Sequence, residues 1–73
     1  YRHGENKFRK SIGKQIENRR KKLGLTQGEL AKMCGLVQTT VSKIELGRFS
    51  VSLDLLQRVC KPLKCHMELK PDD

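Results

Sequence analysis

The sequence has 73 residues, of which 16 are Lys or Arg and 8 are Asp or Glu, so its formal net charge is +8. A chain this short builds a single small core, which is too little for a deep catalytic pocket. It holds no run of about 20 apolar residues, and this excludes a membrane-spanning helix. The excess of positive charge predicts a polyanionic partner, with nucleic acid ahead of an acidic membrane surface.

The positive charge is concentrated near the N-terminus. Residues 1–22 carry nine basic and two acidic residues, which leaves +7, whereas residues 23–73 carry seven basic and six acidic residues, which leaves +1. Such a run is often only a solvated helix face, but its density favours an electrostatic contact surface. Lys14, within this run, is a candidate for contact with a phosphate backbone.

Apolar spacing predicts a first helix inside the basic segment. Phe8, Ile12, Ile16 and Leu23 recur at intervals close to a helical period. We therefore expect a helix over about residues 8–22, preceded by a flexible basic segment over residues 1–7.

Two further helices follow at close spacing. Thr26 and Glu29 form a capping box, in which the Thr26 hydroxyl accepts a bond from the Glu29 N–H and the Glu29 side chain reaches back. Gly35 ends this helix because glycine adopts a left-handed backbone easily. The next helix is expected over about Gln38–Leu46. A helix, a short turn that contains glycine and a second helix define a helix-turn-helix unit over residues 26–46.

A fourth helix and a short strand complete the pattern. Ser52 is a good N-cap for the fourth helix, and Pro62 is expected to end it because proline lacks an N–H. Apolar and polar residues then alternate, which predicts a strand over residues 64–70 with one apolar face. The apolar positions of that strand are Cys65, Met67 and Leu69. Since the chain offers no second strand, we expect pairing with the same segment of another copy in a homodimer; the alternative is an irregular tail.

The outward face of the third helix has the chemistry of base recognition. The second helix of such a unit enters the major groove of duplex DNA, where Gln pairs with adenine, Lys donates to guanine, and Thr offers its hydroxyl or its methyl group. Gln38, Thr39 and Lys43 lie on this face. Taken alone they are ordinary residues of an amphipathic helix, but the helix-turn-helix unit and the charge favour a DNA contact.

The order and spacing of many residues carry a resemblance to a known family. They are Leu23, Gly24, Leu25, Thr26, Gln27, Glu29, Leu30, Ala31, Gly35, Val41, Ser42, Lys43, Ile44, Glu45, Gly47, Ser52 and Leu53. On them, residues 12–63 resemble the lambda-repressor/Cro family of helix-turn-helix regulators, also called the XRE family. The resemblance implies an all-α domain of four helices that binds double-stranded DNA as a homodimer on palindromic sites and regulates transcription as a repressor. The following residues 64–69 resemble the HipB-like antitoxins, in which a C-terminal strand pairs across the dimer.

The resemblance also implies roles for individual residues. The base-reading positions of the family match Gln38, Thr39 and Lys43. The positions that touch phosphate or flanking bases match Gln27, Thr40, Ser42 and Arg48. Arg20 and Glu45 match an ion pair that ties the first helix to the end of the third. The expected organisation is a flexible segment over residues 1–7, a DNA-binding domain over 8–63, a dimerisation strand over 64–70 and a tail over 71–73.

Three residues depart from the family pattern. Val37 stands where the family often has a Ser or Thr N-cap, so the third helix starts less firmly. Leu46 replaces a common Asn that contacts phosphate, and Val51 replaces a frequent Pro before the fourth helix.

The HipB-like tail favours, as the alternative, an antitoxin that binds a kinase-like toxin and autoregulates its operon.

Membrane-surface binding needs an apolar stripe with bulky anchors, which residues 1–22 do not supply. No arrangement typical of an enzyme is present, and no cofactor or metal is expected, since the spacing of Cys60, Cys65 and His66 matches no common zinc site. These two cysteines and Cys34 are expected to be small buried thiols in the reducing cytoplasm of a bacterial or phage-type regulator.

Overall fold

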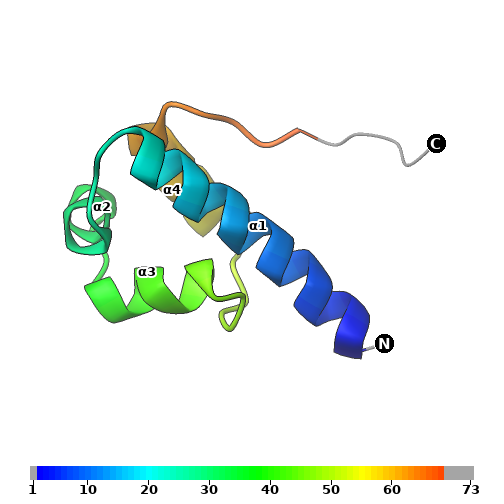
Figure 1. Ribbon diagram of the computed structural model, residues 1–73. Coiled ribbons are helices and arrows are strands. Elements are labelled where there is room, and N and C mark those ends of the chain that lie inside the picture. The colour runs from blue at the N-terminus through cyan, green and yellow to red at the C-terminus, as the bar shows by residue number, and fades with distance from the viewer. Residues whose placement is uncertain (1, 69–73) are drawn as a thin grey trace.

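Four helices are packed around one core (Figure 1). A computed structural model describes the backbone of residues 2–68 and the side chains of residues 7–68. The helices are α1 (Arg2–Lys22), α2 (Gln27–Cys34), α3 (Gln38–Glu45) and α4 (Leu53–Leu63). Within the described residues the expected architecture of four helices is confirmed, and none of these helices is long and apolar enough to cross a membrane.

Helix α1 is longer than the sequence indicated. It begins at Arg2, so the backbone of residues 2–7, expected to be a flexible segment, is helical. Figure 1 shows that the N-terminal half of α1 extends beyond the other helices, which pack along its C-terminal half. Phe8, on the extending part, and Leu23, just after the helix, are exposed, contrary to their assignment to the apolar face. Ile16 is buried and Ile12 partly buried.

The capping residues of α2 and α4 act as expected. Thr26 Oγ1 accepts a bond from the Glu29 N–H at 3.0 Å, and Glu29 Oε1 accepts one from the Thr26 N–H at 2.8 Å. Gly35 closes α2 in the left-handed conformation, with φ 73°. At the start of α4, Ser52 Oγ accepts a bond from the Leu55 N–H at 3.1 Å.

The end of α4 differs from the expectation that Pro62 terminates the helix. The helix includes Pro62 and continues to Leu63, whose side chain is fully buried. Lys64 then turns left-handed, with φ 55°. The side chain of Arg19 stabilises this end, because its Nε donates to the Leu63 carbonyl at 2.8 Å and its Nη2 to the Lys64 carbonyl at 3.3 Å. Burial of Leu63 and this cap account for the extra residue of helix.

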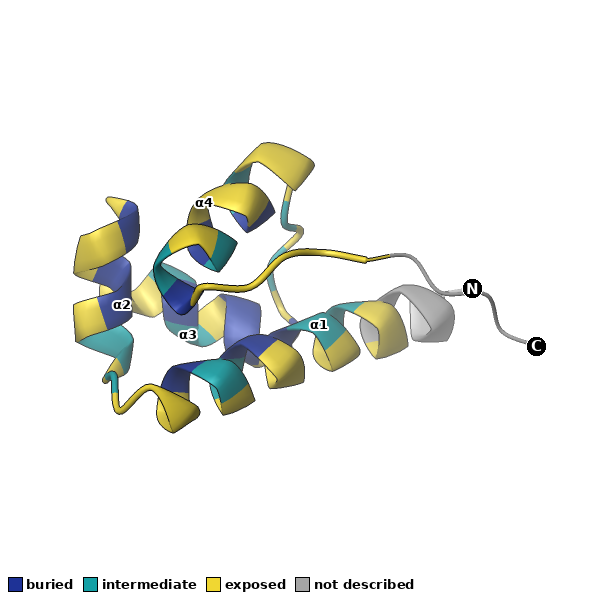
Figure 2. Ribbon diagram, turned by 90° about the horizontal axis from the view of Figure 1, so that it is seen from above, coloured by how far each residue is buried: buried dark blue, intermediate teal, exposed yellow. Residues whose placement is uncertain are grey.

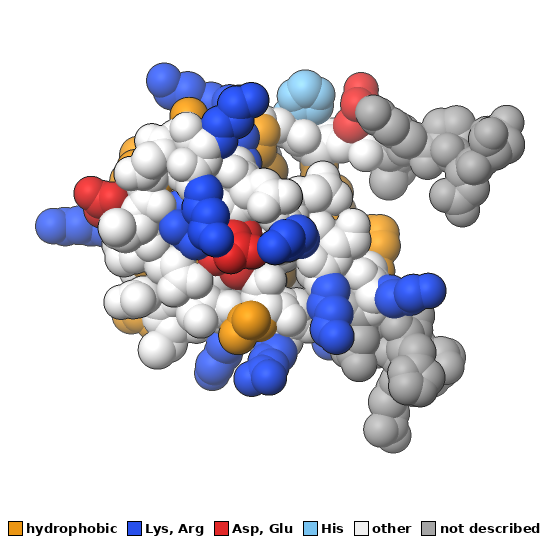
Figure 3. Space-filling view, in the orientation of Figure 1, with side chains coloured by type: hydrophobic (Ala, Val, Ile, Leu, Met, Phe, Trp, Pro, Cys, Tyr) orange, Lys and Arg blue, Asp and Glu red, His pale blue; other side chains and the backbone are white. Residues whose placement is uncertain are grey.

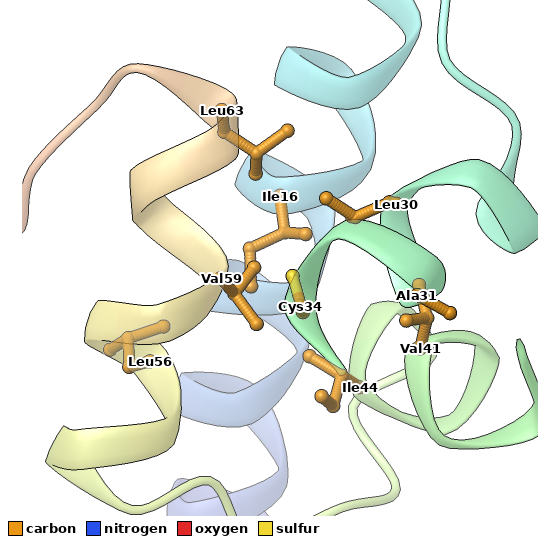
Figure 4. Close-up of a cluster of buried hydrophobic side chains, with 9 residues drawn as sticks. All are labelled: Ile16, Leu30, Ala31, Cys34, Val41, Ile44, Leu56, Val59 and Leu63. Atoms are coloured by element: carbon orange, nitrogen blue, oxygen red, sulfur yellow. The ribbon is translucent and has the colours of Figure 1, made fainter. Parts of the chain in front are cut away.

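The core lies where the four helices meet (Figure 4). Its buried side chains are Ile16, Leu30, Ala31, Cys34, Val41, Ile44, Leu56, Val59 and Leu63. Beside it, α1 and the end of α3 approach each other closely at Gly13. A β-carbon on Gly13 would lie only 2.3 Å from the Ile44 carbonyl oxygen and 2.6 Å from that of Glu45. Glycine at this position therefore sets the depth at which the two helices pack.

The segment after α4 is an extended coil on the surface. Residues 65–68 form no strand in the structure, and Leu69 lies outside the described residues. The predicted strand needs a second copy of the chain as its partner. The structure of a single chain does not test this pairing, which stays a prediction. Cys65 is exposed and Cys60 half-buried, whereas all the cysteines were expected to be buried; Cys34 alone is fully so. Cys65 comes directly after the last turn of α4, and Figure 2 shows the segment after α4 as exposed.

Candidate nucleic-acid interface

A buried hydrogen-bond network fixes the relative orientation of α1, α2 and α3. Arg20 and Glu45 form a bidentate ion pair. Arg20 Nε donates to Glu45 Oε2 at 2.6 Å, and Arg20 Nη2 donates to Glu45 Oε1 at 3.1 Å. Arg20 Nη1 also donates to the Leu25 carbonyl at 2.8 Å. Gln27 Nε2 donates to Glu45 Oε1 at 2.9 Å. Four charge-assisted or polar contacts thus join the end of α1, the start of α2 and the end of α3.

The charge of this network is well compensated. Arg20 and Glu45 are both more than nine-tenths buried, and the hydrogen bond to Glu45 raises the pKa of the Arg20 guanidinium above its usual value. Among the described side chains, no buried nitrogen or oxygen lacks a hydrogen-bond partner. Complete pairing is needed at a buried ion pair, because an unpaired partner would leave an uncompensated buried charge that destabilises the fold.

Helix α3 presents one apolar face to the core and one polar face to solvent. Val41 and Ile44 are buried against the other helices. The three residues predicted to read bases, Gln38, Thr39 and Lys43, are all exposed. Thr40 and Ser42, predicted to touch phosphate or flanking bases, are half-buried at the edges of this face. The structure therefore brings all five predicted contact residues of α3 onto one accessible side of the helix.

The first residues of α2 and α3 lie close together. A β-carbon on Gly28 would lie 3.9 Å from Gln38 Oε1, which places the Gln38 amide against the first turn of α2. Gln27 lies in that same turn. Since the Glu45 carboxylate can only accept, the Gln27 amide group turns an N–H toward it and keeps its second N–H for another acceptor. Gln27 and Gln38 therefore lie close together where α2 and α3 begin, at one end of the surface predicted to enter the major groove.

Basic side chains flank this surface. On the face in Figure 3, Lys and Arg side chains lie along α1 and at the edge beneath α3, while acidic side chains are sparse. Arg48, in the loop after α3, is exposed. Lys14 is exposed too, but it already contacts Glu17 at 3.4 Å, and Lys21 contacts the other oxygen of that carboxylate at 3.1 Å. The hydrogen bond from Lys21, and to a smaller extent the one from Lys14, lowers the pKa of Glu17 below its usual value.

Two exposed apolar residues lie beside the predicted interface, at the two ends of α3. Val37, at the start of α3, is 64% exposed, and Leu46, at its end, is 54% exposed. As an aliphatic residue, Val37 supplies no side-chain cap, in keeping with the weaker helix start inferred from the sequence. This exposure agrees with the resemblance, which matches Val37 to an N-cap position and Leu46 to an Asn that contacts phosphate.

The fold and this surface define a DNA-binding helix-turn-helix domain, with α2 and α3 as its two central helices. Comparison with protein families matches residues 16–70 to the family described as helix-turn-helix. The chain belongs to this family, and the predicted resemblance to XRE-type helix-turn-helix proteins is confirmed. The HipB-like strand is not confirmed by this match.

Two curated relatives have sequences similar to this chain. One, from Methanothermobacter thermautotrophicus, is named an uncharacterized HTH-type transcriptional regulator and is 46% identical over 48 residues, which cover 66% of this chain and 70% of the relative. The other is Antitoxin PezA of Streptococcus pneumoniae serotype 4, which is 40% identical over 50 residues. That match covers 68% of this chain but only 32% of the antitoxin, so the similarity is confined to about a third of that protein.

Proposed function

We propose that the chain is a sequence-specific transcriptional regulator that acts as a homodimeric repressor on palindromic DNA sites. The observation that carries this proposal is the polar face of α3, where Gln38, Thr39 and Lys43 are exposed while the opposite face is buried. An α-helix with this polarity fits the major groove, and the fixed orientation of α2 and α3 presents it to the duplex.

Each reading residue has a chemical counterpart on the base edges. Gln38 suits adenine, because its amide both donates and accepts, and Lys43 suits the two acceptors of guanine. Thr39 offers a hydroxyl to a base or a methyl group to thymine. Gln27 contributes its second amide N–H to a phosphate, while its bond to Glu45 at 2.9 Å holds the amide in place.

The positions of α3 and of the C-terminal segment suit a two-fold dimer. Figure 1 shows α3 along one edge of the molecule and the segment after α4 along the opposite edge. Pairing of residues 64–70 between two copies would leave both α3 helices free to face one side of a duplex. Two such helices reach successive major grooves about 34 Å apart, and the two-fold symmetry of the dimer requires a palindromic site.

Binding selection from random duplex DNA tests the proposal, with the wild type and Gln38→Ala run in parallel. We expect a palindromic motif with half-sites about one helical turn apart, changed at one position by the substitution. On the selected site Gln38→Ala should cost roughly 1–3 kcal/mol, and on unrelated DNA almost nothing. Equal losses on both DNAs, or recovery of unselected sequences with steep salt dependence, would contradict direct base reading.

The similarity to Antitoxin PezA supports a second candidate function. In this alternative the chain is an antitoxin of the HipB-like type that binds a kinase-like toxin and autoregulates its operon. Expression of the tagged chain in its own cells, followed by affinity purification, distinguishes the two. A stoichiometric co-purified toxin that the chain inhibits supports the antitoxin, whereas a homodimer free of such a partner supports the stand-alone regulator.

A further inference from the structure

Two of the three cysteines meet at the C-terminal end of α4. The Cys65 N–H donates to the Cys60 carbonyl at 3.1 Å, and Cys65 Sγ lies 3.8 Å from the same oxygen. Both residues line one groove of about 440 Å³ between α4 and the following segment, together with Leu56 and Met67. All three cysteines of the chain are free thiols.

The backbone geometry at this helix end is a Schellman motif. The Lys64 N–H donates to the Lys61 carbonyl at 3.1 Å, and the Cys65 N–H donates to the Cys60 carbonyl, which gives the two nested bonds of that motif. Side chains at these two outer positions regularly contact each other. In this chain both are cysteines, so the motif holds two thiols together that are five residues apart in sequence.

The separation of the two α-carbons is compatible with a disulfide. Each α-carbon lies only one or two covalent bonds from an end of the 3.1 Å contact between the Cys65 nitrogen and the Cys60 oxygen. Standard bond lengths therefore keep the two α-carbons of Cys60 and Cys65 within about 7 Å of each other, the upper end of the range that disulfides span. Because the backbone already turns back on itself here, bond formation needs only side-chain rotation and small adjustments.

We propose that Cys60 and Cys65 form a reversible intramolecular disulfide when the chain meets a low-molecular-weight disulfide oxidant such as oxidised glutathione. Cytosolic disulfides of this kind are usually transient and redox-sensing rather than structural. The pair is therefore a modification site on the side of the domain opposite α3.

The two thiols have different roles in the exchange. Cys65 is exposed, and its thiolate attacks the oxidant, so that one glutathione thiolate leaves and a mixed disulfide forms on Cys65. The Cys60 thiol then loses its proton to solvent and attacks the Cys65 sulfur, which releases the second glutathione thiolate. In sum, two protein thiols and one glutathione disulfide give one protein disulfide and two glutathiones. Burial, followed by the hydrogen bond with Cys65, raises the pKa of Cys60 to about 11, which makes it the slower, resolving thiol.

The third cysteine is an internal control. Cys34 is 5% exposed within the core, and burial raises the pKa of its thiol. Both effects disfavour attack on an oxidant. We therefore expect Cys34 to stay reduced while the folded chain is oxidised.

The test is to incubate the reduced, folded full chain with oxidised glutathione, quench it in acid, and label the remaining thiols with a maleimide after denaturation. The intact mass should show a chain that is not covalently linked to another and carries one maleimide label, whereas the reduced chain carries three. Digestion with trypsin without reduction should release residues 59–64 joined by a disulfide to residues 65–73, because Lys64 is cleaved while Lys61 is protected by Pro62. Dithiothreitol should restore three labels.

Single substitutions separate the steps. Cys60→Ser should leave Cys65 as a stable glutathione mixed disulfide, whereas Cys65→Ser should keep two labelled thiols under the same conditions. Three labels on the wild type after oxidation, a persistent mixed disulfide on Cys65, or a link between two Cys65 residues of different chains would each overturn the proposal.

A consequence for assembly rests on the proposed function. The bond would hold Cys65 against α4 and remove it from the apolar face of the proposed pairing strand, so oxidation should shift the homodimer toward monomers in sedimentation. A chain that forms the Cys60–Cys65 bond but is monomeric before and after oxidation contradicts the dimer and leaves the disulfide supported. A dimer whose chains never form the bond contradicts the disulfide alone.

Discussion

The side chain of Gln27, the first residue of α2, donates to the side chain of Glu45, the last residue of α3, at 2.9 Å. Glu45 Oε1 accepts from Arg20 of α1 as well. One carboxylate therefore joins three helices at a point beside the predicted DNA surface. The orientation of α3, and with it that of the predicted DNA surface, is supported by a buried polar network in addition to the apolar core beneath it.

The first prediction concerns the Arg20–Glu45 pair. Removal of one partner from a buried ion pair leaves the other charge without compensation, so Arg20→Ala should lower the free energy of unfolding by about 3–5 kcal/mol. The midpoint of urea denaturation, followed by circular dichroism, measures this loss. Lys21→Ala is the matched control, because its pair with Glu17 lies on the surface, where exposed ion pairs contribute little to stability. Similar midpoints for the two variants would show that the buried pair does not stabilise the fold.

The second prediction compares two glycines that both lie within helices. Gly13→Ala places a methyl group 2.3 Å from the Ile44 carbonyl oxygen, so α1 and α3 must separate. We expect a loss of about 1–3 kcal/mol in the free energy of unfolding, as for other overpacked sites. Gly28→Ala meets its nearest side-chain atoms only at 3.9 Å and gains helix propensity, so it should stabilise by roughly 0.5 kcal/mol. Thermal unfolding of both variants checks the opposite signs.

Local signals in the sequence predicted the helices and their caps well. Thr26 with Glu29, and Ser52 before α4, are chemical patterns that need only neighbouring residues to act, and both form the expected bonds. The outward face predicted for the third helix is likewise exposed, at Gln38, Thr39 and Lys43. These features depend on interactions within a few residues, which sequence spacing describes directly.

Contacts between distant residues were harder to predict from the sequence. The close approach at Gly13 has a weak signal, a glycine inside a helix, but nothing in the sequence says which carbonyl it meets. The cap of Arg19 on Leu63 joins residues 44 positions apart and has no local signature, so the end of α4 was placed too early. The contact between Cys60 and Cys65 depends on the left-handed turn at Lys64, a conformation that lysine adopts rarely.

The third prediction concerns the salt dependence of DNA binding under the proposed function. Arg48 and Lys14 are assigned to phosphate contacts, so Arg48→Ala and Lys14→Ala should each weaken binding to all sequences alike. Loss of one phosphate contact reduces the slope of log K against log salt by about 0.9. Lys61→Ala is the control, because Lys61 lines the groove beside the C-terminal segment rather than the α3 edge. An unchanged slope for Arg48→Ala or Lys14→Ala would remove that residue from the contact set.

The fourth prediction concerns the proposed dimer. Met67 is 47% exposed, and it belongs to the apolar face of the predicted pairing strand. Met67→Lys, or truncation after Leu63, should therefore yield monomers in sedimentation. His66→Lys adds a charge at the neighbouring position, which alternation places on the opposite face of a strand, and should keep the dimer. A dimeric mass for Met67→Lys and for the truncated chain would place the interface elsewhere.

The last prediction concerns pH and the surface carboxylate of Glu17. The pKa of Glu17 is lowered mainly by its hydrogen bond with Lys21 and further by Lys14. Because the folded state favours the charged carboxylate, the stabilisation it provides is present above the unfolded pKa, near 4.5, and is lost as the pH falls through the lowered folded value. Titration followed by carboxyl NMR should show a Glu17 midpoint below 4.5 at low salt, and Lys21→Gln should move it upward. High salt should move it in the same direction, since both lysines are exposed and screened by ions. A midpoint that neither salt nor the substitution changes would show that these lysines do not set it.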